Sequence, residues 1–227
     1  MSQADLFAAL RAGDTSKFQE ILDADPALLN VKNENGVSAV LMACYMGRKE
    51  IRDLLIARGA HLELHEAAAA GHLPRVKEVV EADHAAAASY SPDGFPVVAL
   101  AAVFGHEEVA RYLHSKGADV NAISRNATGY TALTGAVASN HVAMTKWLVE
   151  NGADVNYRYV KGHSPLLEAA ANGNLEIAKI LLAHGADANA RTDDGKSALN
   201  FAEERGHTEV AALLRNSTSS RAAGPSS

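Results

Sequence analysis

The sequence predicts an all-α solenoid of stacked helix-turn-helix repeats with short β-hairpin-like finger loops between them. A segment at residues 129–156 recurs with variation on both sides of itself. The glycines that end these segments are 35 residues apart from Gly117 to Gly152 and 33 residues apart from Gly152 to Gly185, a period typical of solenoids. The chain is 48% hydrophobic but only 5% aromatic, so its apolar side chains are mostly small. Such side chains suit thin layers of closely packed helices better than one thick core.

Two motifs frame each copy of the segment. The first begins Gly129-Tyr130-Thr131-Ala132-Leu133, and the second reads Gly-Ala-Asp-Val-Asn at residues 117–121 and 152–156. Together they resemble the signature of ankyrin repeats, Gly-x-Thr-Pro-Leu-His-x-Ala-Ala-x-x-Gly-His followed by Leu-Leu-x-x-Gly-Ala-Asp-Val-Asn. The resemblance extends over nearly the whole chain. It implies paired helices, finger loops that project sideways, and a concave groove of fingers and first helices that binds another protein.

We expect the repeats to form one domain, residues 1–215. In the first repeat, a short helix ends near Gly13 and its partner stops before Pro26, because proline cannot continue a helix. Residues 216–227 are small and polar, which predicts a disordered tail. The predicted repeats span approximately residues 2–34, 35–60, 61–92, 93–128, 129–161, 162–193 and 194–215.

The third repeat departs from the pattern at its start. Leu64 follows Gly59 after only five residues, whereas Leu166 follows Gly152 after fourteen. A finger loop is therefore missing, and we expect residues 59–64 to form a tight junction that is the weakest joint of the array.

The first two repeats resemble the next two. Their glycines recur with an offset of 58 residues, which suggests that repeats one and two are a duplicate of repeats three and four. The four glycine pairs are Gly13 and Gly71, Gly36 and Gly94, Gly47 and Gly105, and Gly59 and Gly117.

Two further departures lie in the later repeats. Gly117 and Leu133 are sixteen residues apart, two more than usual, so we expect residues 124–128 to protrude as a long finger. The last repeat places Glu203, Glu204 and Arg205 on its first helix, as a capping repeat requires where one face meets water.

Charge and composition limit the partners and the compartment. The formal net charge is -6 with a pI of about 5.9, which opposes a sequence-independent grip on nucleic-acid phosphates. The N-terminus has no basic start and long apolar run of a secretory signal, and no apolar stretch is long enough to span a membrane. We therefore expect a cytoplasmic monomer with no nucleic-acid or membrane partner.

The histidines invite a metal or catalytic hypothesis. Those at the turns between paired helices, such as His141 and His207, are interpreted as tying up unpaired backbone groups. His61, His65 and His84 lie near the shortened junction and leave open a metal or small-molecule site there. With no other recognisable ligand or catalytic pattern, we expect no enzyme activity, no cofactor and no resident metal.

Two single residues have a structural interpretation. Cys44 aligns with a buried alanine of the signature, so a core thiol is favoured over a nucleophile. Trp147 falls at a leucine or isoleucine position on the second helix and is expected to pack between neighbouring repeats.

The predicted function is a protein-interaction scaffold or adaptor that binds a protein partner through the concave groove. A regulatory or inhibitory subunit of an enzyme is the alternative, and Phe95 and Phe104 could instead cover the gap left by the missing finger. The groove positions lie just before each turn glycine and just after each finger glycine. They are Tyr45, Met46, Phe95, Val103, Phe104, Tyr130, Ser139, His163 and Asn172.

Overall fold

The computed structural model describes residues 2–222 and confirms the predicted all-α repeat architecture. By contacts between Cα atoms, the chain divides into two compact units, an N-terminal unit that ends at Ala86 and a C-terminal unit that begins at Ala87. A short 3₁₀ helix, η2 (His84–Ala88), spans this division. No helix within residues 2–222 is both long and apolar enough to cross a bilayer.

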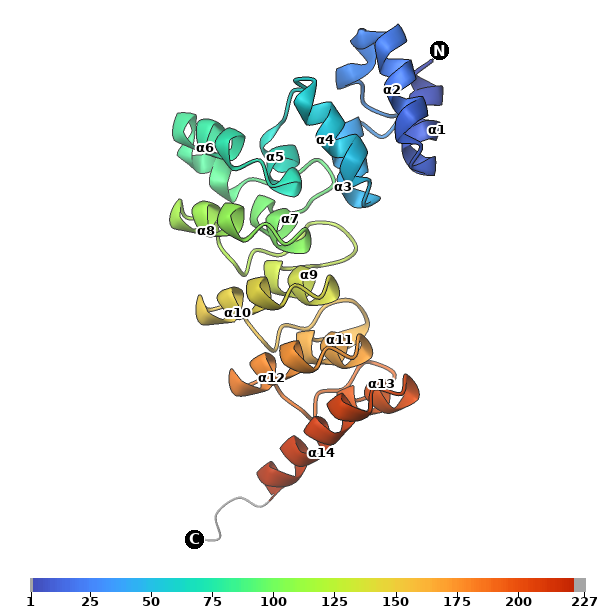
Figure 1. Ribbon diagram of the computed structural model, residues 1–227. Helices are drawn as coiled ribbons and strands as arrows, with labels where there is room; N and C mark the ends of the chain where they lie inside the picture. The colour runs from blue at the N-terminus through green and yellow to red at the C-terminus, as the bar shows by residue number, and fades with distance from the viewer. Residues whose placement is uncertain (1, 223–227) are drawn as a thin grey trace. The chain divides into compact units, whose positions relative to one another are not determined.

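The N-terminal unit contains three helical pairs. In each pair the two helices are antiparallel neighbours joined by a tight turn, and a 3₁₀ helix follows the first pair (Figure 1). Its elements are α1 (Gln3–Ala12), α2 (Thr15–Ala24), η1 (Pro26–Asn30), α3 (Ala39–Tyr45), α4 (Lys49–Ala57), α5 (Leu64–Ala70) and α6 (Leu73–Ala82).

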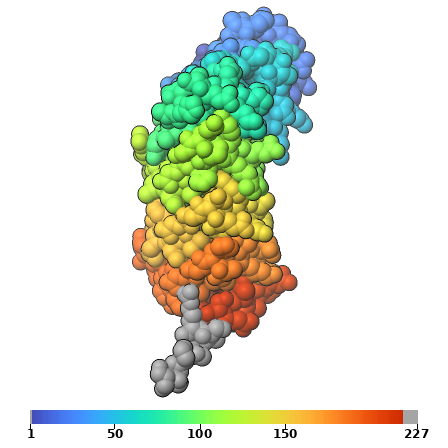
Figure 2. All heavy atoms as spheres, turned by 90° about the vertical axis from the view of Figure 1, so that its left-hand side faces the viewer, coloured from blue at the N-terminus to red at the C-terminus, as the bar shows by residue number. Residues whose placement is uncertain are grey.

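The C-terminal unit contains four helical pairs stacked in sequence order. First helices pack on first helices, and second helices on second helices, so that α8, α10 and α12 line the face turned to the viewer in Figure 2. Its elements are α7 (Val97–Val103), α8 (Glu107–Ser115), α9 (Ala132–Ala138), α10 (Val142–Glu150), η3 (Val160–Gly162), α11 (Pro165–Ala171), α12 (Leu175–Ala183), α13 (Ala198–Glu204) and α14 (Thr208–Ala222).

Side-chain caps determine where the first helices begin. At α9, the Thr131 hydroxyl accepts from the Thr134 backbone N–H at 3.3 Å, and the Thr131 N–H donates to the Thr134 hydroxyl at 2.8 Å. Ser164 caps α11, where Pro165 supplies the fixed backbone angle that suits the first helical position. Ser197 caps α13 in the same way as Thr131. The Thr or Ser of the repeated motif is therefore the start signal of each of these helices.

The turns between paired helices require a left-handed backbone. Glycine supplies it at most of them, as at Gly105 with φ of 75° and Gly173 with φ of 69°. In the fifth repeat Asn140 takes this place with φ of 59°, a conformation that asparagine tolerates better than most residues.

The first helices pack closely because their side chains are small. Every residue from Val97 to Ala102 in α7 and from Ala132 to Val137 in α9 is buried. The closest approach lies between these helices, where a Cβ added to Gly135 would overlap Cγ2 of Val103. Glycine at position 135 is therefore a packing requirement, and the thin layers follow from it.

An isolated antiparallel bridge closes each of four fingers. The bridges join Lys32 to Ser38, Tyr90 to Pro96, Tyr159 to His163 and Arg191 to Ser197. The first two bridges are offset by 58 residues, and so are η1 and η2. The local structure thus follows the sequence correspondence between repeats one and two and repeats three and four, and the duplication itself stays a hypothesis.

The long finger does not protrude freely, which corrects the prediction for residues 124–128. Ser124 is buried, and the Arg125 N–H donates to the Gly94 carbonyl of the preceding finger at 2.8 Å. The Arg125 guanidinium lies 3.7 Å from the centre of the Tyr90 ring. Asn126 donates its side-chain amide to the Asp93 carbonyl at 2.8 Å. The two extra residues therefore fold back onto the neighbouring finger.

The other two boundary predictions also change. The shortened junction at residues 59–64 lies inside the N-terminal unit, where the His61 N–H donates to the Asn30 side chain at 2.8 Å and Arg75 Nε donates to the Leu62 carbonyl at 2.9 Å. The contact division falls at Ala86 instead. At the other end, α14 continues to Ala222, past the predicted end at residue 215, and residues 223–227 of the predicted tail lie outside the described residues.

Candidate functional site

The surface formed by the fingers and the first helices, which we call the groove face, carries the predicted partner-binding positions. In the N-terminal unit, Tyr45 and Met46 lie at the end of α3 with 41% and 39% of their surface exposed. A hollow of about 480 Å³ lies between α1, α3 and the first finger. Phe7 and Met42 are among its apolar lining residues, and Arg11 and Glu34 among its charged ones. This unit therefore presents apolar surface beside a hollow with charges of both signs.

In the C-terminal unit, four rings from three successive repeats form a row that we call the aromatic ladder. The Tyr130 and Tyr159 rings meet edge to face with their centres 5.4 Å apart. The Tyr159 and His163 rings are 6.0 Å apart, and the His163 and Phe201 rings 5.5 Å apart. All four side chains are half-buried. The ladder brings together two predicted site residues, Tyr130 and His163, and two that the sequence analysis did not select.

A carboxylate lies beside the ladder. Glu168, on α11, accepts a hydrogen bond from the Tyr159 hydroxyl at 3.2 Å, and its Oε2 lies 3.7 Å from Nδ1 of His163. Burial, followed by the Glu168 carboxylate, raises the pKa of Tyr159, so this hydroxyl stays protonated and acts as a donor. The same two causes, in the same order, raise the pKa of Tyr130.

His163 Nδ1 is buried and has no hydrogen-bond partner. It is too far from Glu168 for a hydrogen bond, since 3.7 Å exceeds the usual donor–acceptor distance. The neighbours that the structure gives to Glu168 are thus a tyrosine hydroxyl and an imidazole, and no lysine or arginine among the described residues forms an ion pair with it.

Other predicted site residues have roles within the stack. Val103 packs against α9 at Gly135, and its carbonyl contacts His141 Nε2 at 3.0 Å. The Asn172 side-chain amide lies 3.4 Å from the Ala138 carbonyl at the end of α9. These contacts give Val103 and Asn172 structural work in addition to any binding role. Phe95 and Phe104 are half-buried and Ser139 is exposed.

The residues at the turns between paired helices link successive repeats. His207 Nε2 lies 3.2 Å from the Ala171 carbonyl of the preceding repeat, as His141 does from Val103. Arg48 occupies the equivalent place in the second repeat, and its guanidinium donates to the Arg11 carbonyl at 2.6 Å. His72 behaves differently, because its Nδ1 accepts from the Arg75 N–H and caps its own helix. The interpretation of these histidines as backbone partners is confirmed, and for two of them the partner belongs to the neighbouring repeat.

Cys44 and Trp147 have the predicted structural roles. Cys44 is 6% exposed, and burial raises the pKa of its thiol to about 12. Trp147 on α10 is buried, packs edge to face on His114 of α8 and lies under the Arg111 guanidinium, 5.2 Å from the ring centre. Its side chain joins two neighbouring repeats.

The shortened junction forms a hollow of about 450 Å³ in the N-terminal unit, lined in part by His61, His72 and Arg75. Within residues 2–222, however, no group of three or more histidine, cysteine, aspartate or glutamate side chains is arranged to hold a metal ion. The metal centre of His61, His65 and His84 that the sequence left open is therefore not formed in this part of the chain.

Tyr159, Glu168 and Phe201 were missed by the sequence analysis. Glu168 and Phe201 share one position of the repeated motif, directly before the alanine that follows on the first helix, and the selection covered only positions beside the glycines. Tyr159 pairs with His163 across the base of a finger. The repeat alignment could have found the first two, because it places them on the same face of successive helices.

Comparison with known proteins agrees with this architecture. The family model for ankyrin repeats, which represents three copies, matches residues 64–159 and 157–221. The mouse protein "Ankyrin repeat and SAM domain-containing protein 6" is 33% identical over 128 residues, which are 56% of this chain and 12% of that protein. The human protein "Ankyrin repeat and KH domain-containing protein 1" is 32% identical over 129 residues, which are 57% of this chain and 4% of that protein.

The chain thus spans only a small part of the length of these relatives. The match to the family model covers most of the chain and includes all the helical pairs of the C-terminal unit. With its capped helix pairs, its left-handed turns and its bridged fingers, the chain belongs to the ankyrin-repeat family.

Proposed function

We propose that this protein is a non-catalytic interaction scaffold that binds a protein partner through its groove face. Ankyrin repeats are generally protein-interaction modules. The observation that carries the proposal is the exposure of large apolar side chains at groove positions, with Tyr45 at 41% and Met46 at 39%. Most large apolar side chains of the described chain are buried, so these two stand where packing does not require them.

Exposed aromatic side chains are suited to binding. Tyrosine adds a large contact area at a small cost in side-chain entropy, and interface hot spots are enriched in it. The net charge of -6 favours a protein over a nucleic acid as the partner. We further propose that the protein acts as a monomer in the cytoplasm.

The test is the affinity of a partner isolated by capture from the source cell. Tyr45→Ala, Tyr130→Ala and Phe104→Arg should each weaken the purified partner's binding by about 2 kcal/mol or more, with little change in melting temperature. Lys146→Ala, on the outer helix α10 with its side chain 62% exposed, is the matched control and should bind as the parent does. Groove variants that melt early yet still bind would refute the proposal.

A regulatory or inhibitory subunit of an enzyme would use the same groove face. If the captured partner is an enzyme, its turnover measured with and without this chain distinguishes a regulator from an adaptor. A regulator changes the turnover at saturating concentrations of the chain, whereas an adaptor leaves it unchanged.

A further inference from the structure

We infer that the aromatic ladder with Glu168 is a subsite for a cationic side chain, a lysine or arginine, that the partner protein inserts. The inference rests on the proposed function and goes further, because it specifies the chemistry that one part of the groove face recognises. The site consists of Tyr130, Tyr159, His163, Phe201 and Glu168, all within the C-terminal unit.

The first step is the unbalanced carboxylate. The Glu168 side chain is only 24% exposed, and the residue nearest to balancing its charge is His163, which is charged only when protonated. Glutamates nearby on the same unit have permanent cations, such as Glu204 with Lys196 at 2.7 Å. A partly buried carboxylate without a permanent cation gains more from an incoming charge than an exposed one, because water screens it less.

The second step is the aromatic surroundings. The faces of tyrosine and phenylalanine rings carry negative potential and attract ammonium and guanidinium groups within about 6 Å. The chain already shows such a contact at one end of the ladder, where Lys196 Nζ lies 5.7 Å from the centre of the Phe201 ring. Lys196 is engaged with Glu204, so it does not neutralise Glu168.

The third step excludes other occupants. An acidic side chain would be repelled by Glu168, and a purely apolar one would cover the carboxylate without supplying a counter-ion, which is costly. A lysine or arginine supplies the positive charge together with an aliphatic stem that packs on the rings. Charge complementarity therefore selects a basic segment of the partner.

The inference is tested by nuclear magnetic resonance titrations of the full chain, labelled at tyrosine, phenylalanine and histidine. The probes are four acetylated, amidated tripeptides with lysine, arginine, norleucine or glutamate between two alanines. The lysine and arginine peptides should shift the ring signals of Tyr130, Tyr159, His163 and Phe201, and the norleucine and glutamate peptides should not.

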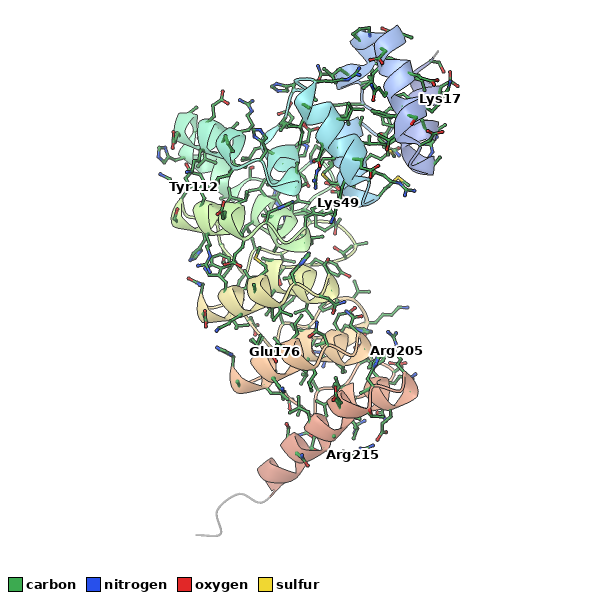
Figure 3. All side chains as sticks on the ribbon, in the orientation of Figure 1. Lys17, Lys49, Tyr112, Glu176, Arg205 and Arg215 are labelled. Atoms are coloured by element: carbon green, nitrogen blue, oxygen red, sulfur yellow. The ribbon has the colours of Figure 1, made fainter. Side chains whose placement is uncertain are left out.

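Two substitutions separate the charge from the rings. Glu168→Gln keeps the shape and an acceptor for Tyr159, and should weaken binding of the lysine peptide by at least about tenfold. Phe201→Leu keeps apolar volume and should weaken it by about threefold to tenfold. Glu176→Gln on α12, where Figure 3 places this side chain away from Arg205 and the α13 end of the layer, is the matched control. It should bind the lysine peptide as the parent does.

Equal shifts from the norleucine peptide, or undiminished binding of the lysine peptide by Glu168→Gln, would overturn the subsite. So would shifts confined to rings outside the ladder. These outcomes leave the proposed function intact if the Tyr45 and Tyr130 variants still lose the protein partner. The proposed function fails separately if no groove variant affects capture.

Discussion

Two buried threonines of the C-terminal unit differ in what their hydroxyl groups do. Thr134 on α9 accepts from the Thr131 N–H at 2.8 Å and donates to the Thr131 carbonyl at 3.0 Å. Thr145 on α10 is equally buried, but its hydroxyl has no hydrogen-bond partner. A buried polar group contributes to stability when it is paired and costs free energy when it is not.

Valine substitutions at these positions should therefore have opposite results. Thr134→Val leaves the Thr131 N–H without its side-chain partner and should lower the free energy of unfolding by about 1 to 3 kcal/mol. Thr145→Val removes an unsatisfied hydroxyl while keeping the shape, and should be neutral or stabilising. Urea unfolding of both variants beside the parent checks this, and equal losses at the two sites would contradict it.

At this scale, the sequence was sufficient where one residue type has one local role. The buried Cys44, the packed Trp147 and the caps at Thr131 and Ser164 follow from their places in the repeated motif. The aromatic ladder was not predicted as a unit, because it depends on how Tyr159 and Phe201 from different repeats are brought to neighbouring places.

At the scale of elements, the close approach of α7 and α9 depends on one glycine. Helix propensity alone would favour alanine over glycine at position 135 by about 0.5 to 1 kcal/mol. The overlap of an added Cβ with Val103 Cγ2 opposes this gain, since crowding a packed core costs about 1 to 3 kcal/mol.

Gly135→Ala should therefore destabilise the protein in the parent and not in a Val103→Ala background, where the space is open. A double-mutant cycle measured by chemical unfolding gives the coupling between the two positions. Stabilisation by Gly135→Ala in both backgrounds would show that packing does not require glycine here.

The finger loops show why some elements could not be predicted. Counting residues indicated two extra positions in the fourth finger, and the count was right. The direction was wrong, because the bonds from Arg125 to Gly94 and from Asn126 to Asp93 join neighbouring fingers and have no local sequence signal. The continuation of α14 to Ala222 similarly runs against the small polar composition of residues 216–222.

At the scale of the molecule, the division into two compact units at Ala86 bears on stability. In a repeat array each repeat contacts only its neighbours, so local stability follows the local contacts. The shortened junction at residues 59–64 has cross-links on both sides, including the ion pair of Arg58 with Asp23 at 2.6 Å.

Hydrogen exchange followed by mass spectrometry should therefore show a change in protection near residues 86–87, with residues 59–64 sharing the protection of the repeats beside them. The exchange of peptides that cover each helical pair gives the profile directly. A drop confined to residues 59–64 would restore the junction as the weak joint.

The central claim is that a protein partner sits on the groove face. It is tested most directly by placing a photo-activated phenylalanine analogue at Tyr45 or Tyr130 on the groove face, and at Lys146 on the outer helix α10, and irradiating each variant with the captured partner. We predict cross-links to the partner from Tyr45 and Tyr130 and none from Lys146. Cross-links from Lys146 alone would place the partner on the outer helices and contradict the account.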